Sequence, residues 1–398
     1  MGILHTLKSC FTAKPKLREI DSTRPASAGV TAVFHTPPIL TEKPITQLAT
    51  PTITGTTTPF TQQALIVATK GTYLLDESFP VPEIQDGEEV LIRNHAVGLN
   101  PIDWKSVDWN FCIPTFPWVT GREMSGVVEQ VGENVTEFKK GDRVWTSTDY
   151  YRDIRSGCFQ EYVIAPKHTV KPIPSKLSFE SAACLGVCGL TAAMTLWKWL
   201  GIPMFDTAQS SQSSGNLLLV WGGSSITGQF LIQIATYSGL EVIAVTSERT
   251  AELVSRLGAK HVITRDDKSN DDIVAEARAI GGDAIVKAVD IVGPETAVYC
   301  MKALSSKSPV QLAPLSFLPK DVVTPPNVSI ENVEMKWFVL NKISESYATA
   351  LNSLVERGCV KIPELDVIAG GLAAIPEGLN MQKRGNLGGK KLVVSLRG

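Results

Sequence analysis

The most informative segment of this chain is Val220-Trp221-Gly222-Gly223-Ser224-Ser225-Ile226-Thr227-Gly228. It follows an apolar run at residues 216–221 and opens a helical pattern at residues 228–238. Small residues let the backbone approach a pyrophosphate, and a helix N-terminus supplies free N–H groups and a positive dipole. The loop is not a clean Gly-x-Gly-x-x-Gly, so its place between two strands carries the argument. We therefore predict a dinucleotide-binding loop, and the alternative is a tight turn without a ligand.

Strands and helices alternate around this loop. After a helix at residues 180–200, apolar strands are expected at residues 216–221, 241–246, 261–263, 284–290 and 310–312. Helices are expected at residues 228–238, 250–257, 271–280 and 294–304. Buried strands that alternate with helices indicate a parallel sheet with right-handed crossovers.

The segments before and after this alternating region show a different pattern of residues. Short strands separated by glycine and charged turn residues are expected at residues 64–68, 89–94, 126–131, 142–145 and 160–165. This pattern predicts a strand-rich, barrel-like domain. The final part of the chain shows a helix near residues 344–357 and a closing strand at 391–395, which we expect to return to that domain.

Residues 1–60 are unlike the rest. They hold seven prolines and no Trp or Tyr, and eleven threonines lie from Thr31 to Thr61. Such a segment has little to bury, so we expect a flexible extension. Gly2 fits a myristoylation pattern, and Cys10 with nearby basic residues gives a second membrane signal. A lipid anchor, a mitochondrial presequence and a plain soluble tail all remain open.

Composition limits the class of protein. The chain is 43% apolar and 20% charged, as is ordinary for a globular protein, and its net charge of -2 argues against a general nucleic-acid binder. No uninterrupted apolar run approaches the ~20 residues that span a bilayer. Seven cysteines, an odd number without a Cys-x-x-Cys, indicate a reducing compartment, and we expect a cytoplasmic location.

The end of the second strand of the parallel sheet bears on cofactor choice. An NAD enzyme usually places an acidic residue there to hold the ribose 2′-hydroxyl. Here Ser247 and Arg249 offer a hydroxyl and a cation suited to a 2′-phosphate, although Glu248 lies between them. We therefore predict NADP (NADPH) rather than NAD.

Nine short segments, in their order, resemble the medium-chain dehydrogenase/reductase superfamily. They are residues 100–105, 121–128, 131–132, 141–144, 157–162, 190–192, 222–228, 257–259 and 389–393. The similarity covers about residues 62–398 and is closest to fungal members, including trans-acting enoyl reductases of polyketide pathways and quinone-reductase-like proteins. It implies an α/β fold with a GroES-like β-rich catalytic domain at 61–185, a Rossmann domain at 186–335 and a return to the catalytic domain at 336–398.

The resemblance also implies a site and argues against zinc. Near the first zinc-ligand position of the superfamily's alcohol dehydrogenases this chain reads Leu99-Asn100-Pro101. It has Arg122 at the histidine position, and Cys188 lies near the third position but offset by one, so we expect no metal. Lys105 and Thr191 are the catalytic candidates, with a salt bridge and a helix-internal hydroxyl as their structural alternatives. The residues expected to bind the cofactor are Asn100, Pro101, Asp103, Lys105, Thr191, Gly222, Gly223, Ser224, Ser225, Ile226, Thr227, Ser247 and Arg249.

The function that this resemblance implies is hydride transfer without zinc. We expect reduction of a conjugated C=C in an enoyl, enone or quinone substrate, in fungal secondary metabolism. Metal-free carbonyl or alcohol redox is one alternative, and an NADPH-binding protein without turnover is another. A short-chain dehydrogenase is excluded because no tyrosine has a lysine four residues later. The expected partner is a small-molecule substrate, and both a monomer and a homodimer remain open.

Overall fold

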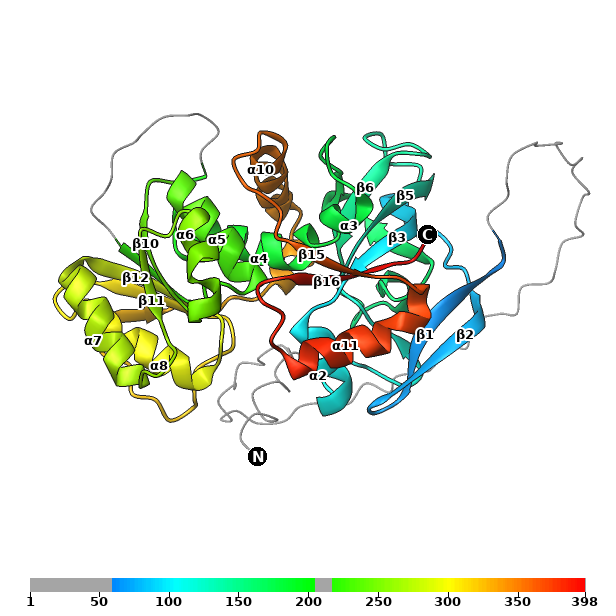
Figure 1. Ribbon diagram of the computed structural model, residues 1–398. Helices are drawn as coiled ribbons and strands as arrows, with labels where there is room; N and C mark the ends of the chain where they lie inside the picture. The colour runs from blue at the N-terminus through cyan, green and yellow to red at the C-terminus, as the bar shows by residue number, and fades with distance from the viewer. Residues whose placement is uncertain (1–58, 205–216, 398) are drawn as a thin grey trace, which may run out of the picture. The chain divides into compact units, whose positions relative to one another are not determined.

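The structure is a computed structural model that describes residues 59–204 and 217–397 (Figure 1). The extension expected at residues 1–60, with Gly2 and Cys10, lies outside the described residues except for its last two positions. Residues 205–216 also lie outside them.

A six-stranded parallel sheet forms the first structural layer. Its order is β11-β10-β9-β12-β13-β14, which is a doubly wound arrangement. Successive strands are added on one side of β9 as far as β11, and then on the other side from β12, which pairs parallel with β9. The strands are β9 (Leu217–Trp221), β10 (Glu241–Thr246), β11 (His261–Thr264), β12 (Ile285–Asp290), β13 (Val310–Pro314) and β14 (Val328–Ile330). The predicted parallel sheet is confirmed, while β14 was missed because three residues give too little pattern.

Helices cover both faces of this sheet because its strands alternate between two cores. Leu218 and Val220 of β9 enter one core with Phe230, whereas Leu217 and Leu219 enter the other with the helices that follow β11 and β12. The helices are α5 (Ile226–Tyr237), α6 (Ala251–Arg256), α7 (Asn270–Gly281) and α8 (Pro294–Ala303). Because both faces of the sheet are buried against apolar cores, the sequences of its strands are continuous apolar runs.

The second part is β-rich, as predicted. A seven-stranded sheet has the order β15-β16-β3-β5-β6-β8, with β7 also paired to β3, and a small sheet joins β2, β1 and β4. The closing strand β16 pairs antiparallel with β3, so the end of the chain returns to the β-rich part, as expected (Figure 1). The strands are β1 (Thr61–Thr69), β2 (Thr72–Pro80), β3 (Glu89–Gly98), β4 (Trp118–Val119), β5 (Glu123–Val131), β6 (Arg143–Ser147), β7 (Tyr162–Pro166), β8 (Val170–Pro172), β15 (Leu365–Ile368) and β16 (Lys391–Ser395).

Several helices pack on or between these sheets. They are α2 (Pro101–Trp109), α3 (Phe179–Ala182), α4 (Leu190–Met194), α9 (Lys336–Leu340), α10 (Glu345–Glu356) and α11 (Ile375–Arg384). The helix expected at residues 180–200 is α3 and α4 with π-helical turns at Leu185–Gly189 and Thr195–Trp199. The segment Phe179–Trp199 is long and apolar enough to cross a bilayer, but 72% of its most apolar window is buried inside the protein, as in a core helix.

Helix α2 was missed although its sequence carries a start signal. Asn100 stands before the helix, Pro101 occupies the first position, and the Asp103 carboxylate accepts a 2.8 Å hydrogen bond from the Asn100 backbone N–H. These contacts fix the beginning of α2, which places Asn100 beside the site described next.

Candidate functional site

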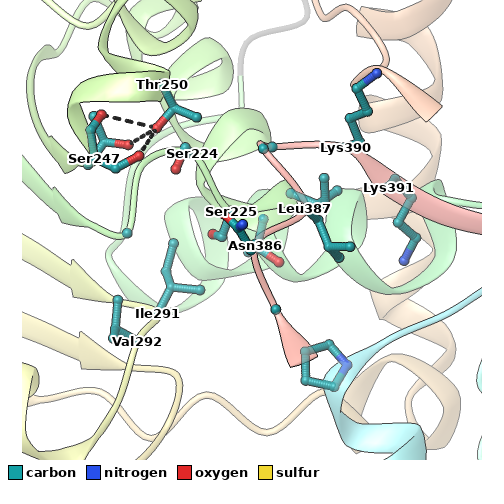
Figure 2. A pocket seen from close by; sticks show the side chains of 18 of the residues that line it. Ser224, Ser225, Ser247, Thr250, Ile291, Val292, Asn386, Leu387, Lys390 and Lys391 are labelled. Carbon is teal, nitrogen blue, oxygen red and sulfur yellow. Dashed lines mark hydrogen bonds between the residues drawn. The ribbon is translucent and has the colours of Figure 1, made fainter. Parts of the chain in front are cut away.

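A pocket of about 660 Å³ lies at the carboxyl ends of the parallel strands (Figure 2). Trp221 ends β9, Thr246 ends β10, and Ile291 follows β12, and all three line the pocket. In doubly wound sheets this edge, where the strand order reverses, is where ligands bind. The position therefore agrees with the loop that the sequence singled out.

The loop after β9 is held in a tight turn by its own backbone hydrogen bonds. Gly222 has a positive φ of 95°, and the N–H groups of Gly222 and Gly223 both donate to Val245 O, at 3.0 and 2.9 Å. Ser225 caps helix α5, since its Oγ accepts a 3.1 Å hydrogen bond from the Gly228 N–H. The helix N-terminus thus faces the pocket with its positive dipole end, which suits a diphosphate.

Hydroxyl groups gather at the end of β10. Thr250 Oγ1 lies 2.6 Å from Thr246 Oγ1 and 2.9 Å from Ser247 Oγ, and Figure 2 shows Ser247 and Thr250 on one side of the pocket. Arg249 and Arg265 also line this end of the pocket. Among the residues that the structure describes, no carboxylate lies within 4.0 Å of either guanidinium.

The Glu248 side chain does not line the pocket. The residue is exposed, and its backbone N–H donates to Asp266 Oδ2 at 2.5 Å. Glu248 therefore weighs less against NADP than the sequence suggested, because its neighbours Ser247 and Arg249 line the pocket and Glu248 does not.

A segment from the β-rich part closes the opposite wall. Residues 385–392 line the pocket, and Gly389 O accepts a 2.7 Å hydrogen bond from Gln229 Nε2 of α5. The same amide donates to Ser224 O at 3.0 Å. Figure 2 shows Asn386 and Leu387 of this segment beside the loop that carries Ser224 and Ser225. The two parts of the chain are therefore joined across the pocket.

A buried ion pair borders the pocket on its catalytic-domain side. Lys391 Nζ lies 2.6 Å from Glu123 Oε1 and 2.8 Å from Asn100 Oδ1, and the Lys391 and Glu123 side chains are 1% and 0% exposed. Cys188 Sγ lies 3.3 Å from Asn100 Oδ1 and 3.5 Å from Lys391 Nζ. Burial alone lowers the pKa of Lys391, but Cys188 and Glu123 outweigh it, and the pKa is raised. The ammonium group therefore stays charged.

This arrangement does not fit a zinc ion. Asn100 and Cys188, which lie near the first and third zinc-ligand positions, both contact the Lys391 ammonium, and Arg122 stands at the histidine position. A divalent cation at that place would meet a buried positive charge instead of deprotonated ligands. Within residues 59–204 and 217–397, no group of three or more His, Cys, Asp or Glu side chains is placed to hold a metal.

The structure separates the predicted site residues into two groups. Those that line the pocket are Asn100, Pro101, Gly222, Ser224, Ser225, Ile226, Thr227, Ser247 and Arg249. Gly223, Asp103, Lys105 and Thr191 are not part of its lining. Lys105 Nζ instead lies 5.6 Å from the ring centroids of both Trp104 and Trp109, and partial burial lowers the pKa of Lys105. Roles for these four residues stay predictions.

Sequence reasoning missed much of the lining. The pocket-lining residues that were not identified as site residues include Thr250, Arg265, Asn270, Thr296, Gln382 and the segment 385–390. The glycines at 385, 388 and 389 were the one available signal, because clustered glycines mark places where backbone approaches a ligand closely.

Asp103 is fully buried, and burial raises its pKa to about 7 although Arg122, the Asn100 N–H and Lys391 oppose the shift. The folded chain thus keeps this proton at pH values where the unfolded chain, near the ordinary value of 3.8, has lost it. The free energy of unfolding must then fall as pH rises from about 4 to about 7.

We expect Asp103→Asn to remove this part of the pH dependence. Asparagine keeps an acceptor for the Asn100 N–H but cannot titrate. Between pH 5 and pH 8 the free energy of unfolding of the variant should therefore fall less than that of the parent, by on the order of 2 kcal/mol. Urea unfolding at both pH values measures this. Asp108→Asn, on the same helix and paired with exposed Lys383, serves as the control, and equal pH profiles for all three chains would contradict the assignment.

Comparison with known protein families gives two matches. The model described as alcohol dehydrogenase GroES-like domain matches residues 86–175, and the model described as zinc-binding dehydrogenase matches residues 227–356.

Individual proteins agree with these matches. The chain is 30% identical to "Trans-enoyl reductase himH" of Aspergillus japonicus over 77% of this chain and 90% of the relative. It is 29% identical to a "Trans-enoyl reductase" of Gibberella fujikuroi over 84% and 98%. Among solved structures, the CurK enoyl reductase superposes with a TM-score of 0.71 at 20% identity, covering 84% of this chain and 99% of that one. A mycobacterial protein complexed with NADPH superposes with a TM-score of 0.69 at 23% identity, covering 84% and 100%.

Proposed function

Because this chain belongs to the medium-chain dehydrogenase/reductase family, we propose that it is an NADPH-dependent oxidoreductase that reduces a conjugated C=C bond without zinc. The substrate is a small molecule with an enoyl, enone or quinone group. The relatives named trans-enoyl reductases are fungal, which supports a place in fungal secondary metabolism.

The observation that carries the cofactor assignment is the charge of the pocket. No Asp or Glu lines it among the described residues, while Arg249 and Arg265 stand beside the hydroxyls of Ser247 and Thr250. A carboxylate that accepts from a ribose 2′-hydroxyl is the usual mark of NAD, and guanidinium groups are the usual partners of a 2′-phosphate. The site therefore favours NADP over NAD.

The residues around the pocket suit the parts of the cofactor. The α5 N-terminus would hold the diphosphate, and the segment 385–390 would cover it. Asn100, Pro101 and Cys188 would border the nicotinamide side. When bound, NADPH supplies a hydride. The apolar side chains of Trp221, Ile291 and Val292 line the pocket next to Gly222 and would pack against the bound cofactor there.

Hydride addition to the β-carbon of a conjugated carbonyl builds an enolate, so the chain must stabilise negative charge on oxygen without a metal. Hydrogen-bond donors can do this. Lys105 and Thr191 remain candidates by resemblance, although neither lines the described pocket.

The state of the cysteines bears on where the protein works in the cell. The six described cysteines form no disulfide with one another, which is consistent with a reducing, cytoplasmic setting. A monomer and a homodimer both remain compatible with the structure.

The test of this function follows NADPH oxidation by absorbance with enoyl thioesters, enones and quinones, and identifies the products. A saturated carbonyl product supports the proposal. An allylic alcohol would support carbonyl reduction instead, and tight NADPH binding with no turnover would favour a non-catalytic binding protein.

Arg249→Gln should raise the Kd for NADPH about tenfold, because a charge-assisted contact to the 2′-phosphate is lost. The Kd for NADH, which lacks that phosphate, should stay within about twofold. Calorimetric titration with both nucleotides measures this. Glu248→Gln is the matched control on the adjacent exposed residue and should change neither constant. Equal losses for NADPH and NADH in Arg249→Gln would contradict the 2′-phosphate assignment.

A further inference from the structure

Arg122 sits in a cage of two tyrosine rings at the start of β5. Its Cζ lies 5.3 Å from the Tyr150 ring centroid and 5.6 Å from that of Tyr151, and the two rings meet edge to face at 6.2 Å and 80°. The rings hold the guanidinium through cation–π attraction, and a side-chain hydrogen bond between Arg122 and Tyr150 adds to it. Arg122 therefore has a fixed position, and its Nε–H is a donor still to be used.

Arg122 leaves a buried N–H donor without a partner, which is unusual for an arginine with a purely structural role. Its Nε is buried without a hydrogen-bond partner, and within the described part of the chain no carboxylate comes within 4.0 Å of the guanidinium. Arg155 shows the contrast, since its guanidinium is in ion pairs with Glu89 and Asp153. The Arg122 side chain lies deep in the domain, yet part of its surface stays reachable by solvent.

Other polar atoms around the cage also lack partners. The Tyr151 hydroxyl and Asp103 Oδ1 are buried without hydrogen bonds, and the Asp103 side chain is 0% exposed. By contrast, the Tyr150 hydroxyl donates to Ser106 Oγ at 2.9 Å, and Tyr150 O accepts from Trp118 Nε1 at 2.9 Å. Tyr150 is therefore anchored as a wall. Buried polar groups are rarely left unpaired, so several together call for a polar ligand.

The three residues of the cage do not line the pocket, but contacts connect the cage to a residue that does. Arg122 precedes Glu123, whose carboxylate accepts from Asn100 Nδ2 at 2.9 Å, and Asn100 lines the pocket. Asp103, which acts electrostatically on Arg122, is held by the Asn100 N–H at 2.8 Å. Two short connections thus link the cage to one pocket-lining residue.

We propose that the Arg122 guanidinium, together with the Tyr151 hydroxyl, binds the carbonyl oxygen of the substrate and stabilises the negative charge that develops on it. This assignment rests on the proposed function and names the electrophile-stabilising group for it. The substrate class is a conjugated carbonyl compound whose oxygen is free to accept two hydrogen bonds. Arg122 occupies a position aligned with a zinc ligand, so a fixed cation takes over the charge role that a metal would have.

The chemistry balances with this role. When the hydride adds to the β-carbon, the C=C electron pair shifts to form an enolate, and the charge comes to rest on the oxygen beside Arg122. A proton from water then joins the α-carbon, and the C=O bond is restored. Arginine cannot be deprotonated in proteins, so Arg122 donates hydrogen bonds but no proton.

A kinetic comparison tests the proposal on the full chain. Arg122→Met should lower kcat for an enone about 100- to 1000-fold while the Kd for NADPH stays within about twofold. Arg143→Met is the control, because Arg143 makes a similar contact at 4.5 Å to Phe179 while its N–H is already used by Leu177 O at 2.8 Å. Arg122→Lys should show an intermediate loss, and it replaces Arg122→Met if that variant does not fold. A kcat within about threefold of the parent would overturn the proposal.

A binding measurement separates this proposal from the proposed function. 4-Nitrophenol changes absorbance on ionisation, and its phenolate mimics the enolate oxygen. In the presence of NADP⁺, the parent should bind the phenolate at least about tenfold more tightly than Arg122→Met does. Equal affinity would overturn the assignment of Arg122. If the parent binds phenolate through Arg122 but reduces no enone, enoyl thioester or quinone, the proposed function fails while the oxyanion site stands.

Discussion

Lys391→Met is expected to lower the free energy of unfolding by about 3–5 kcal/mol. Lys391 Nζ contacts Glu123 Oε1 at 2.6 Å, and both side chains are almost completely buried. The ammonium also donates to Leu99 O at 2.9 Å and Asn100 Oδ1 at 2.8 Å. Methionine fills the volume of the lysine stem but leaves the Glu123 carboxylate buried without its cation, which is the costly outcome for a buried pair. Urea unfolding at pH 7 measures the loss.

The adjacent lysine is a matched control. Lys390 pairs with Glu364 at 2.5 Å, but these side chains are 45% and 71% exposed. Lys390→Met should therefore cost no more than about 1 kcal/mol. Adding Glu123→Gln to Lys391→Met removes the unpaired charge and should recover part of the lost stability. If Lys391→Met proved as stable as Lys390→Met, the ion pair would not be buried in the way described.

Gly228→Ala is expected to destabilise the chain by about 1–3 kcal/mol and to raise the Kd for NADPH about 10- to 100-fold. Gly228 lies in the first turn of α5, where a Cβ would come within 2.5 Å of Gly222 O and 2.7 Å of Gly223 O. Both are backbone atoms of the loop, so the loop itself must move. The α5 N-terminus, which packs against this loop, then loses its alignment toward the diphosphate. Unfolding in urea and calorimetric titration with NADPH measure the two effects.

Gly293 supplies the control for this substitution. It lies directly before α8, has an extended φ of 179°, and a Cβ there meets nothing within 4 Å. Gly293→Ala should change stability by less than about 0.5 kcal/mol and leave NADPH binding unaltered. Should Gly228→Ala bind NADPH as tightly as the parent, the close contact between helix and loop would have no role in binding.

For Gly228→Ala, helix propensity and the tertiary structure predict opposite effects on stability. By helix propensity alone, alanine in a helix is better than glycine by about 1 kcal/mol, so the sequence of α5 predicts a gain. The backbone of residues 222 and 223 reverses the sign, because it returns to within contact distance of the helix. No periodicity within α5 records that approach.

Much of the fold followed from the amino-acid sequence alone. The apolar runs of β9, β10 and β12, the helices between them and the loop after β9 were identified from residue patterns, and β10 and β16 have the predicted bounds. Such patterns are readable because steric limits on the backbone and the burial of apolar faces act over a few residues. Short elements without a period, such as β14, escaped.

The functional surroundings of the loop depended on tertiary structure. Lys391 meets Asn100 across 291 positions of the chain, and Gln229 meets Gly389 across 160. Arg122 finds its tyrosine cage only because β5 and the turn after β6 are brought together. Sequence determined which segments are strands, helices and a candidate cofactor loop. The tertiary structure decided which charges are paired, which donors remain unused and which residues share the pocket, because those outcomes depend on contacts between distant segments that local patterns do not encode.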